Sequence, residues 1–172
     1  MALTLSGTSG VLDNSGAFIA GTAVASTSGT AISFTSIPSW VKRITVMFNG
    51  VSTDGTSIVQ IQIGSSSYTT TGYTGSGSLL LHPSTLGVVN NSTGFLTSSA
   101  SEATYVRQGS IVLSNITGNT WVASGVIGQS DSARINLCGG ALSLSGVLDR
   151  VQVTTVNGTD TFDAGSINIL YE

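Results

Sequence analysis

The sequence predicts an all-β fold, an antiparallel β-sandwich of jelly-roll-like arrangement with a short N-terminal extension. Charged residues make up 8% of the chain, where an average soluble domain has about 25%, and Lys42, Glu102 and Glu172 are its only lysine and glutamate residues. Long helices need such residues in bulk. Hydrophobic residues still make up 40%, which is enough for a core. Short apolar runs, roughly eight to ten of them, recur between turn signals, as in sandwiches and jelly rolls.

Residues 1–31 differ from the rest of the chain, because they are mostly small and polar with glycine at short intervals. Their apolar residues come in brief pairs such as Phe18-Ile19, which offer too little apolar surface for independent folding. The segment is either a flexible lead or is ordered by pairing with another subunit or a scaffold protein. The apolar pairs favour the second alternative, and we expect the sandwich domain to span 32–172.

The clearest strand signal follows soon after the start of this domain. Ile44, Val46 and Phe48 alternate with Thr45 and Met47, which predicts a strand with one buried face. We expect the following Asn49-Gly50 to turn the chain at once.

A second strand is predicted at 59–63, where valine and isoleucine alternate with Gln60 and Gln62. We expect both amides to face water, because the apolar positions of the alternation take the buried face. Residues 64–78 follow, rich in glycine, serine and threonine, and predict a long loop.

The remaining apolar runs predict the other strands, and the chain is expected to end on one. These runs lie at 79–81, 105–107, 110–113, 121–127, 135–138 and 141–148. Val151 and Val153 then start a predicted hairpin, in which Asn157-Gly158 forms a primed turn. A final alternation at 167–171 predicts that the C-terminus is an integral part of a sheet.

Charge and cysteine content exclude several classes of protein. The net charge is −3 with only five lysine and arginine residues, whereas a surface that follows phosphates needs clustered cations, so we expect no binding to nucleic acid. Cys138 is the only cysteine, which excludes an intrachain disulfide and favours a small buried side chain. We see no signal peptide and no apolar run near the roughly 20 residues that span a bilayer. We therefore expect a soluble product of the cytoplasm without membrane insertion.

Two segments together resemble a known module: IPSWVKRITVMFNGVSTDGTS at 37–57 and LDRVQVTTVNGTDTFDAGSINILYE at 148–172. They are similar to the β-sandwich modules at the C-terminal ends of bacteriophage tail-fibre and related virion proteins, and 120–146 resembles the same module. The resemblance implies a phage appendage protein located in the virion, assembled as a homotrimer. Residues 1–31 lie outside the resemblance and look like a segment that attaches to another virion protein.

Candidate catalytic and metal-binding residues all have simpler structural explanations. His82, the only histidine, lies beside a proline at a strand end and is not part of a G-x-S-x-G pattern, so we interpret it as a loop or edge residue. Asp160 and Asp163 read as turn residues that bond their own backbone rather than as the carboxylate pair of a glycosidase or calcium ligands. We predict no catalytic residue, no metal site and no cofactor.

Glycan binding without catalysis is the strongest functional candidate. Sugars stack their apolar faces on aromatic rings, and Tyr68 and Tyr73 lie in the predicted polar loop, where tyrosine suits an exposed contact surface. The alternative is that the two tyrosines anchor this loop to the domain. We expect Trp40 and Trp121, both at strand starts, to pack in the core or at a subunit interface.

The sequence therefore predicts a non-enzymatic virion protein, a tail fibre that adheres to a host-surface glycan through a trimeric sandwich. The first alternative is a capsid decoration or head-fibre protein, whose N-terminal segment would clamp the shell. A second, from another class, is a depolymerase that cleaves host polysaccharide.

Overall fold

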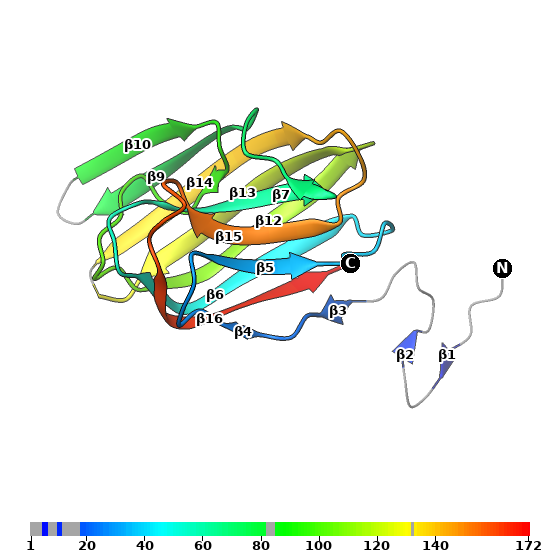
Figure 1. Cartoon of the computed structure of the whole chain (residues 1–172), viewed down its shortest axis with the longest axis horizontal. Coiled ribbons are helices and arrows are strands. Elements are labelled where there is room, and N and C mark those ends of the chain that lie inside the picture. The colour runs from blue at the N-terminus through cyan, green and yellow to red at the C-terminus, as the bar shows by residue number, and fades with distance from the viewer. Residues whose placement is uncertain (1–4, 7–9, 12–17, 82–84, 132) are drawn as a thin grey trace.

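The structure is an antiparallel β-sandwich, which confirms the predicted fold class (Figure 1). It is a computed structural model that describes residues 5–6, 10–11, 18–81, 85–131 and 133–172. In spatial order, the larger sheet contains β10 (Thr85–Asn91), β9 (Thr74–Leu81), β14 (Arg134–Ser143), β13 (Thr120–Gln129), β12 (Arg107–Thr117), β6 (Arg43–Thr53) and β16 (Phe162–Tyr171), with the short β3 (Ile19–Ala20) and β4 (Val24–Ala25) both paired to β16. The smaller sheet contains β11 (Phe95–Leu96), β7 (Val59–Ser65), β15 (Arg150–Thr155) and β5 (Ala31–Thr35), with β8 (Ser67–Tyr68) paired to β7. The short β1 (Leu5–Ser6) and β2 (Gly10–Val11) pair with each other.

The two sheets are unequal, with nine strands in one and five in the other. Strands β12, β13 and β14 form a meander, and β14 lies beside β9, which precedes them in the chain. Such an arrangement is of Greek-key type. The unequal division differs from the eight strands in two Greek keys of a jelly roll.

The core lies between the sheets and is built from the alternation seen in the sequence. In β6, Ile44, Val46 and Phe48 are buried while their neighbours are not, which confirms the predicted strand. In β7, Val59, Ile61 and Ile63 are fully buried, as are Val151 and Val153 in β15. Because residues with these spacings point to one side of a strand, these side chains form the apolar inward face of the smaller sheet.

The predicted turn at Asn49-Gly50 is wrong, because β6 continues through it to Thr53. Gly50 has a φ of +66°, and the pairing of β6 with β16 shifts its register at this point, so the dipeptide forms a β-bulge. Opposite it, Gly165 leaves no space for a Cβ atom beside the Gly50 carbonyl group. A turn signal is overridden here because β12 and β16 pair with β6 on both sides of the bulge.

The C-terminal strand is integral to the larger sheet, as predicted, but the predicted terminal hairpin is wrong. Strand β15 pairs with β5 and β7, whereas β16 pairs with β6, so the connection at 156–161 crosses from one sheet to the other. The N–H of Gly158 donates to Thr155 O at 3.1 Å. Within the described residues of this turn, only Gly158 has a positive φ, whereas a primed turn of type I′ needs two.

The N-terminal segment meets the sandwich at the end where the chain also finishes (Figure 1). Ile19 and Ala20 pair with Tyr171 and Leu170, and β4 pairs with β16 farther along. Part of the predicted attachment segment 1–31 therefore adds to the edge of the larger sheet of its own chain. Its attachment to another virion protein stays a prediction.

Candidate functional site

The outward face of the smaller sheet carries a row of side-chain amides. Gln62 lies directly opposite Gln152 in the register of β7 and β15, and Gln60 lies opposite Thr154. The sequence placed Gln60 and Gln62 on this outer side correctly, but the expectation that they face water is wrong. Gln60 is 1% exposed and Gln62 is 5% exposed.

The turn between β10 and β11 covers these amides and holds them in place. Asn91 Nδ2 and Thr93 Oγ1 both donate to Gln60 Oε1, at 2.9 and 3.0 Å. Gln62 Nε2 donates to Thr93 O at 2.8 Å, and Gln152 Nε2 donates to Gln62 Oε1 at 2.6 Å. Since the amides are paired with one another and with the covering turn, their orientations are defined by the fold.

Beside this network lies a groove of about 400 Å³, whose wall includes Gln60, Gln62 and Gln152 and whose remaining lining is mainly threonine, with Asn157 in the adjoining loop. None of its lining residues carries an ionisable group. The Oε1 atom of Gln152 accepts no hydrogen bond from the residues that the structure describes. The groove therefore offers neutral donors and acceptors that are already fixed in position.

Tyr68 lies on the same outward face, one row beyond the paired glutamines. It pairs with Gly64, which in turn pairs with Arg150. A Cβ atom at Gly64 would clash with the carbonyl group of Ser67, so glycine at this position allows β8 to fold back on β7. The guanidinium of Arg150 lies 5.7 Å from the centroid of the half-buried Tyr68 ring. The role of Tyr68 in ligand binding stays a prediction, and its place beside the groove agrees with that role.

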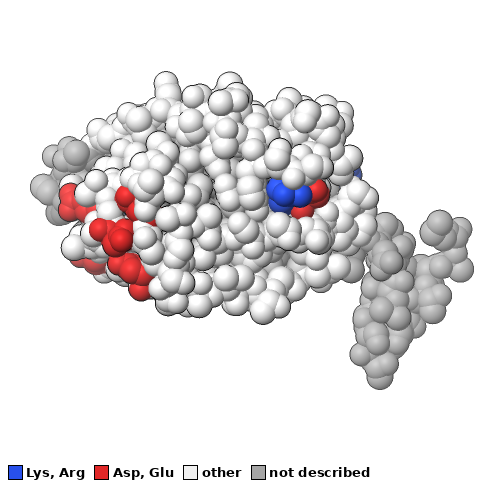
Figure 2. All heavy atoms as spheres, in the orientation of Figure 1, with Lys and Arg blue, Asp and Glu red and all other residues white. Residues whose placement is uncertain are grey.

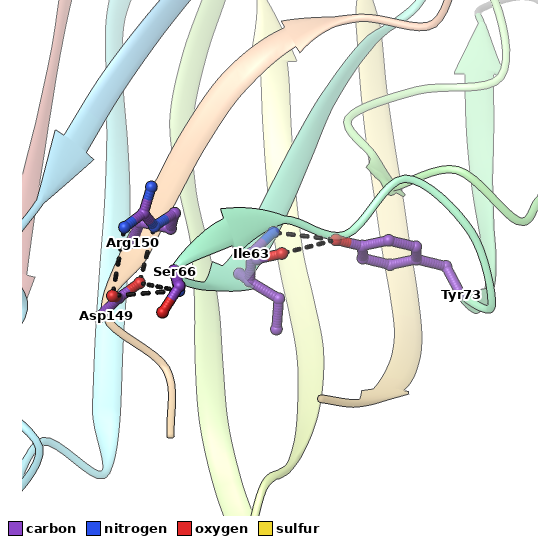
Figure 3. Close-up of polar contacts among 5 residues, drawn as sticks. All are labelled: Ile63, Ser66, Tyr73, Asp149 and Arg150. Atoms are coloured by element: carbon purple, nitrogen blue, oxygen red, sulfur yellow. Dashed lines mark hydrogen bonds and ion pairs between the residues drawn. The ribbon is translucent and has the colours of Figure 1, made fainter. Parts of the chain in front are cut away.

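An ion pair fastens the turn that carries Tyr68 (Figure 3). Arg150 donates to the Asp149 carboxylate at 2.7 and 3.2 Å. The N–H of Ser66, a residue with a φ of +63°, lies 3.1 Å from each carboxylate oxygen. The hydrogen bond from Arg150 is the largest cause of the lowered pKa of Asp149, so the carboxylate stays ionised and keeps hold of the strained turn.

Tyr73 fastens the other end of the same loop (Figure 3). Its hydroxyl accepts from the N–H of Ile63 at 2.9 Å and lies 3.0 Å from Thr69 O. The ring packs edge-on against Phe95 at 4.8 Å between centroids, and burial raises the pKa of the hydroxyl to about 12. Tyr73 is 3% exposed, which favours the alternative considered with its ligand role, that of a loop anchor. Its predicted ligand contact stays a prediction.

The two tryptophans take packing positions. Trp121 lies in the core, and Trp40 packs against Tyr171 with 6.1 Å between ring centroids. Cys138 is partly buried against the core, and burial raises the pKa of its thiol to about 11. These positions leave the three side chains outside the groove.

The prediction that Asp160 and Asp163 bond their own backbone as turn residues is wrong, because both carboxylates bond to residues far away in the chain, and Asp163 lies in β16. The Asp160 carboxylate accepts from the N–H of Ser57 at 2.8 Å, and Asp163 bonds to the hydroxyl of Ser52. Throughout the described ranges, no three histidine, cysteine, aspartate or glutamate residues are grouped to hold a metal ion. His82 lies outside the described residues.

The molecular surface around the groove has little charge. Figure 2 shows this side of the molecule as mostly uncharged, with acidic side chains gathered at one end and one small cluster that contains both signs. A neutral groove in such a surface suits a neutral polar ligand better than a nucleic acid or another polyanion.

The glutamines of the groove were missed as candidate binding residues, although the sequence contains their alternation. Gln60, Gln62 and Gln152 occupy the positions that the strand pattern leaves outside the core. Their pairing depends on β7 and β15 being neighbours, which residues so far apart in the chain do not reveal.

No protein-family model, curated protein or solved structure gives a significant match to this chain. In the part of the chain that the structure describes, no helix has the length and apolar character needed to cross a membrane. The functional argument therefore rests on the groove.

Proposed function

We propose that this chain is a bacteriophage virion protein, a tail fibre whose sandwich adheres to a host-surface glycan through the amide-lined groove. The observation that carries the proposal is Gln152, whose amide is fixed on the outward face of the smaller sheet by a hydrogen bond to Gln62. Gln60 and Gln62 are buried beneath it and bonded to the turn at Thr93, so they hold the groove in shape. The virion placement comes from the resemblance of 37–57 and 148–172 to phage fibre modules.

Amide side chains suit the recognition of sugars, because each has both donors and an acceptor for hydroxyl groups. Here the amides are held by hydrogen bonds to the turn at Thr93 and to each other, so binding does not have to order them first. The volume of about 400 Å³ is within the common range of ligand sites. Tyr68 is not part of the groove lining but lies one row beyond Gln62 on the same outward face.

The chemistry of the groove supports binding without cleavage. Hydrolysis of a glycosidic bond uses two carboxyl groups on opposite sides of the bond. The lining of the groove consists of amide, hydroxyl, aliphatic and glycine residues. A ligand held there meets hydrogen-bonding groups but no general acid or nucleophile of that kind.

The geometry of the chain supports a fibre with its groove turned away from the point of attachment. Ile19 pairs beside the C-terminal end of β16, whereas Asn157 in the groove lies close to the start of that strand. Ten residues of β-strand separate the two ends by roughly 30 Å. Thr30 and Ala31, at the end of segment 1–31, line the groove, so attachment through the start of this segment would leave the groove facing outward. A homotrimer would present three such sites and gain avidity.

Binding of the purified chain to host cells and to an array of neutral glycans tests the proposal. We expect binding that Gln152→Ala weakens at least tenfold, because the substitution removes a fixed donor and acceptor from the groove. Ser33→Ala, on the same outward face but outside the groove lining, is the matched control and should bind normally. Binding that is unchanged in Gln152→Ala, with the fold intact by circular dichroism, would contradict the proposal.

Copy number in the virion tests the placement separately. A tail fibre is present in a few copies per particle, and quantitative mass spectrometry of purified virions should find that number. Hundreds of copies per particle would instead identify a decoration protein of the capsid. Release of reducing sugar from host polysaccharide would identify a depolymerase.

A further inference from the structure

The outward face of the larger sheet is apolar across four neighbouring strands. Leu80 lies opposite both Leu86 and Ile135 in the register, and Leu137 lies opposite Val126. Residues opposite one another, or two apart on one strand, point to the same side. The apolar face therefore comprises Leu80, Leu86, Val88, Val126, Ile135 and Leu137, all between 43% and 66% exposed.

The strands that form this apolar face are almost free of charge. β9, β10 and β13 contain no charged residue, and the only one in β14 is Arg134. The guanidinium of Arg134 lies 4.1 Å from the centroid of the buried Tyr105 ring, and its neighbour Ile135 takes the outward position. Nothing on these strands opposes contact with another uncharged apolar surface.

The edge of the sheet next to this face is partly protected. β10 is the terminal strand of the larger sheet, with β9 as its one partner among the described strands. Edge strands are usually protected from association by lysine, proline, bulges or a covering segment. The seven residues of β10 include neither lysine nor proline, but Ser99 Oγ donates to Gly87 O of this strand at 3.0 Å. The apolar face, rather than this edge, is therefore the surface open to a partner.

We infer that this apolar face is a subunit interface, where the chain packs against further copies of itself. The absence of charge makes the face complementary to its own copy, since neither surface brings a charge that must be desolvated. The other exposed large hydrophobic residues among those described, such as Ile116 and Val147, come from separate elements. Among the described surfaces of this chain, the same face on another copy is therefore the apolar surface that can cover it.

The size of the face agrees with this occupant. Its four strands have seven to ten residues each, and about half of these residues point outward. Stable interfaces use on the order of 20 residues from each partner. Six of these outward positions carry exposed aliphatic side chains, and clustered exposed apolar side chains on soluble proteins mark interaction sites.

The interface would leave the glycan groove accessible, because the groove lies on the outward face of the other sheet. The inference deepens the proposed homotrimer by naming its contact surface, and it rests on the proposed function only for the number of copies. Three chains that turn this face toward a common axis would present three grooves outward. The mass of the assembly and glycan binding are separate measurements, so either can fail without the other.

Native mass spectrometry and light scattering of the purified full-length chain test the inference. We expect an oligomer for the unaltered chain and a monomer for Val126→Glu and Leu137→Glu, since each places a charge in the contact. Ile116→Glu and Val147→Glu are matched controls, because these residues are 63% and 55% exposed but lie outside the face. They should keep the oligomer.

The milder Val126→Ser and Leu137→Ser keep the test valid if a glutamate variant fails to fold, and both should weaken assembly at least tenfold. Circular dichroism confirms that each variant keeps its strands. An unaltered chain that stays monomeric at high micromolar concentration would overturn the inference, as would an oligomer that survives all the substitutions in the face.

Discussion

The two sheets of this protein share one kind of inward face but have opposite outward faces. Inward, both present valine, leucine and isoleucine to a common core. Outward, the smaller sheet presents Gln60, Gln62 and Gln152, whereas the larger sheet presents aliphatic residues such as Val126 and Leu137. Because the inward half of each strand is committed to the core, the outward half is free to differ. The residues between the core positions therefore decide what each sheet can bind.

The outward faces also differ in how firmly their side chains are held in place. The amides are buried under the turn at Thr93 and bonded to it, so the smaller sheet has a shaped polar site. The aliphatic residues of the larger sheet are about half exposed and are covered by nothing in the described chain. We therefore propose a small polar ligand for one face and a broad apolar partner for the other.

The largest effect on the free energy of unfolding is expected for a leucine that faces the core, compared with one that faces outward. Leu113→Ala removes a fully buried side chain and should lower the free energy of unfolding by about 3–5 kcal/mol, at every protein concentration. Leu137→Ala, which truncates a side chain that is 45% exposed, should cost little in dilute solution and more as concentration rises, because assembly stabilises by mass action. Urea unfolding at several protein concentrations checks both. A concentration-independent loss in Leu137→Ala would argue against the self-contact.

The next largest effect on stability is expected to differ between Tyr73 and Tyr68, the two tyrosines at either end of the loop beside the groove. Tyr73→Phe leaves the buried N–H of Ile63 without its partner and should cost about 1–3 kcal/mol. Tyr68→Phe should cost no stability and should raise it slightly, because the Tyr68 hydroxyl is buried without a hydrogen-bond partner among the described residues and its removal relieves a desolvation penalty. Urea unfolding compares them. Equal losses would contradict the anchoring role of Tyr73.

Alkaline pH should weaken the anchored loop gradually. The folded chain keeps the Tyr73 hydroxyl protonated up to a pKa of about 12, above its ordinary value of 10.0, so the unfolded chain ionises first. Since the unfolded state then binds fewer protons, the free energy of unfolding falls as pH rises from 10 to 12. Unfolding midpoints between pH 9 and 12 measure the slope. The Tyr73→Phe variant should have a lower free energy of unfolding at pH 9 and should lose less of it as the pH rises. If the variant loses as much as the unaltered chain, groups other than Tyr73 cause the loss.

The smallest expected effect is that of salt concentration on the affinity for a glycan. The lining of the groove has no ionisable group, so affinity should change less than twofold between 50 and 500 mM sodium chloride. Isothermal titration with a glycan that binds in the array gives the affinity. A tenfold loss in salt would show that the ligand contacts charged residues and would place it outside the groove.

The sequence predicted strands well where one face of a strand is buried. The alternation of Ile44, Val46 and Phe48 was sufficient to place β6, because these side chains are buried while those of the residues between them are not. The turn signal Asn49-Gly50 was misleading, because the local turn preference is outweighed by the pairing of strands on both sides of β6. Turn propensity is local, whereas pairing depends on strands far away in the chain.

The candidate site was predicted only in part. Tyr68 lies on the outward face of the smaller sheet, where its ligand role stays a prediction, whereas Tyr73 has the same local composition and lies in the core. Their difference arises because Tyr73 meets Phe95 and the backbone of Ile63. The amide groove was missed since β7 and β15, which supply it, are far apart in the sequence.

By itself, the sequence determined that this chain forms strands, which residues of each strand face the core, and that the surface has little charge. These properties follow from composition and from the two-residue period of a strand. Only the tertiary structure decided which strands are neighbours, and therefore that three glutamines meet on one sheet and six aliphatic side chains on the other. The reason is that the direction of a side chain is set by its own strand, whereas its neighbours on the sheet are set by pairing between distant parts of the chain.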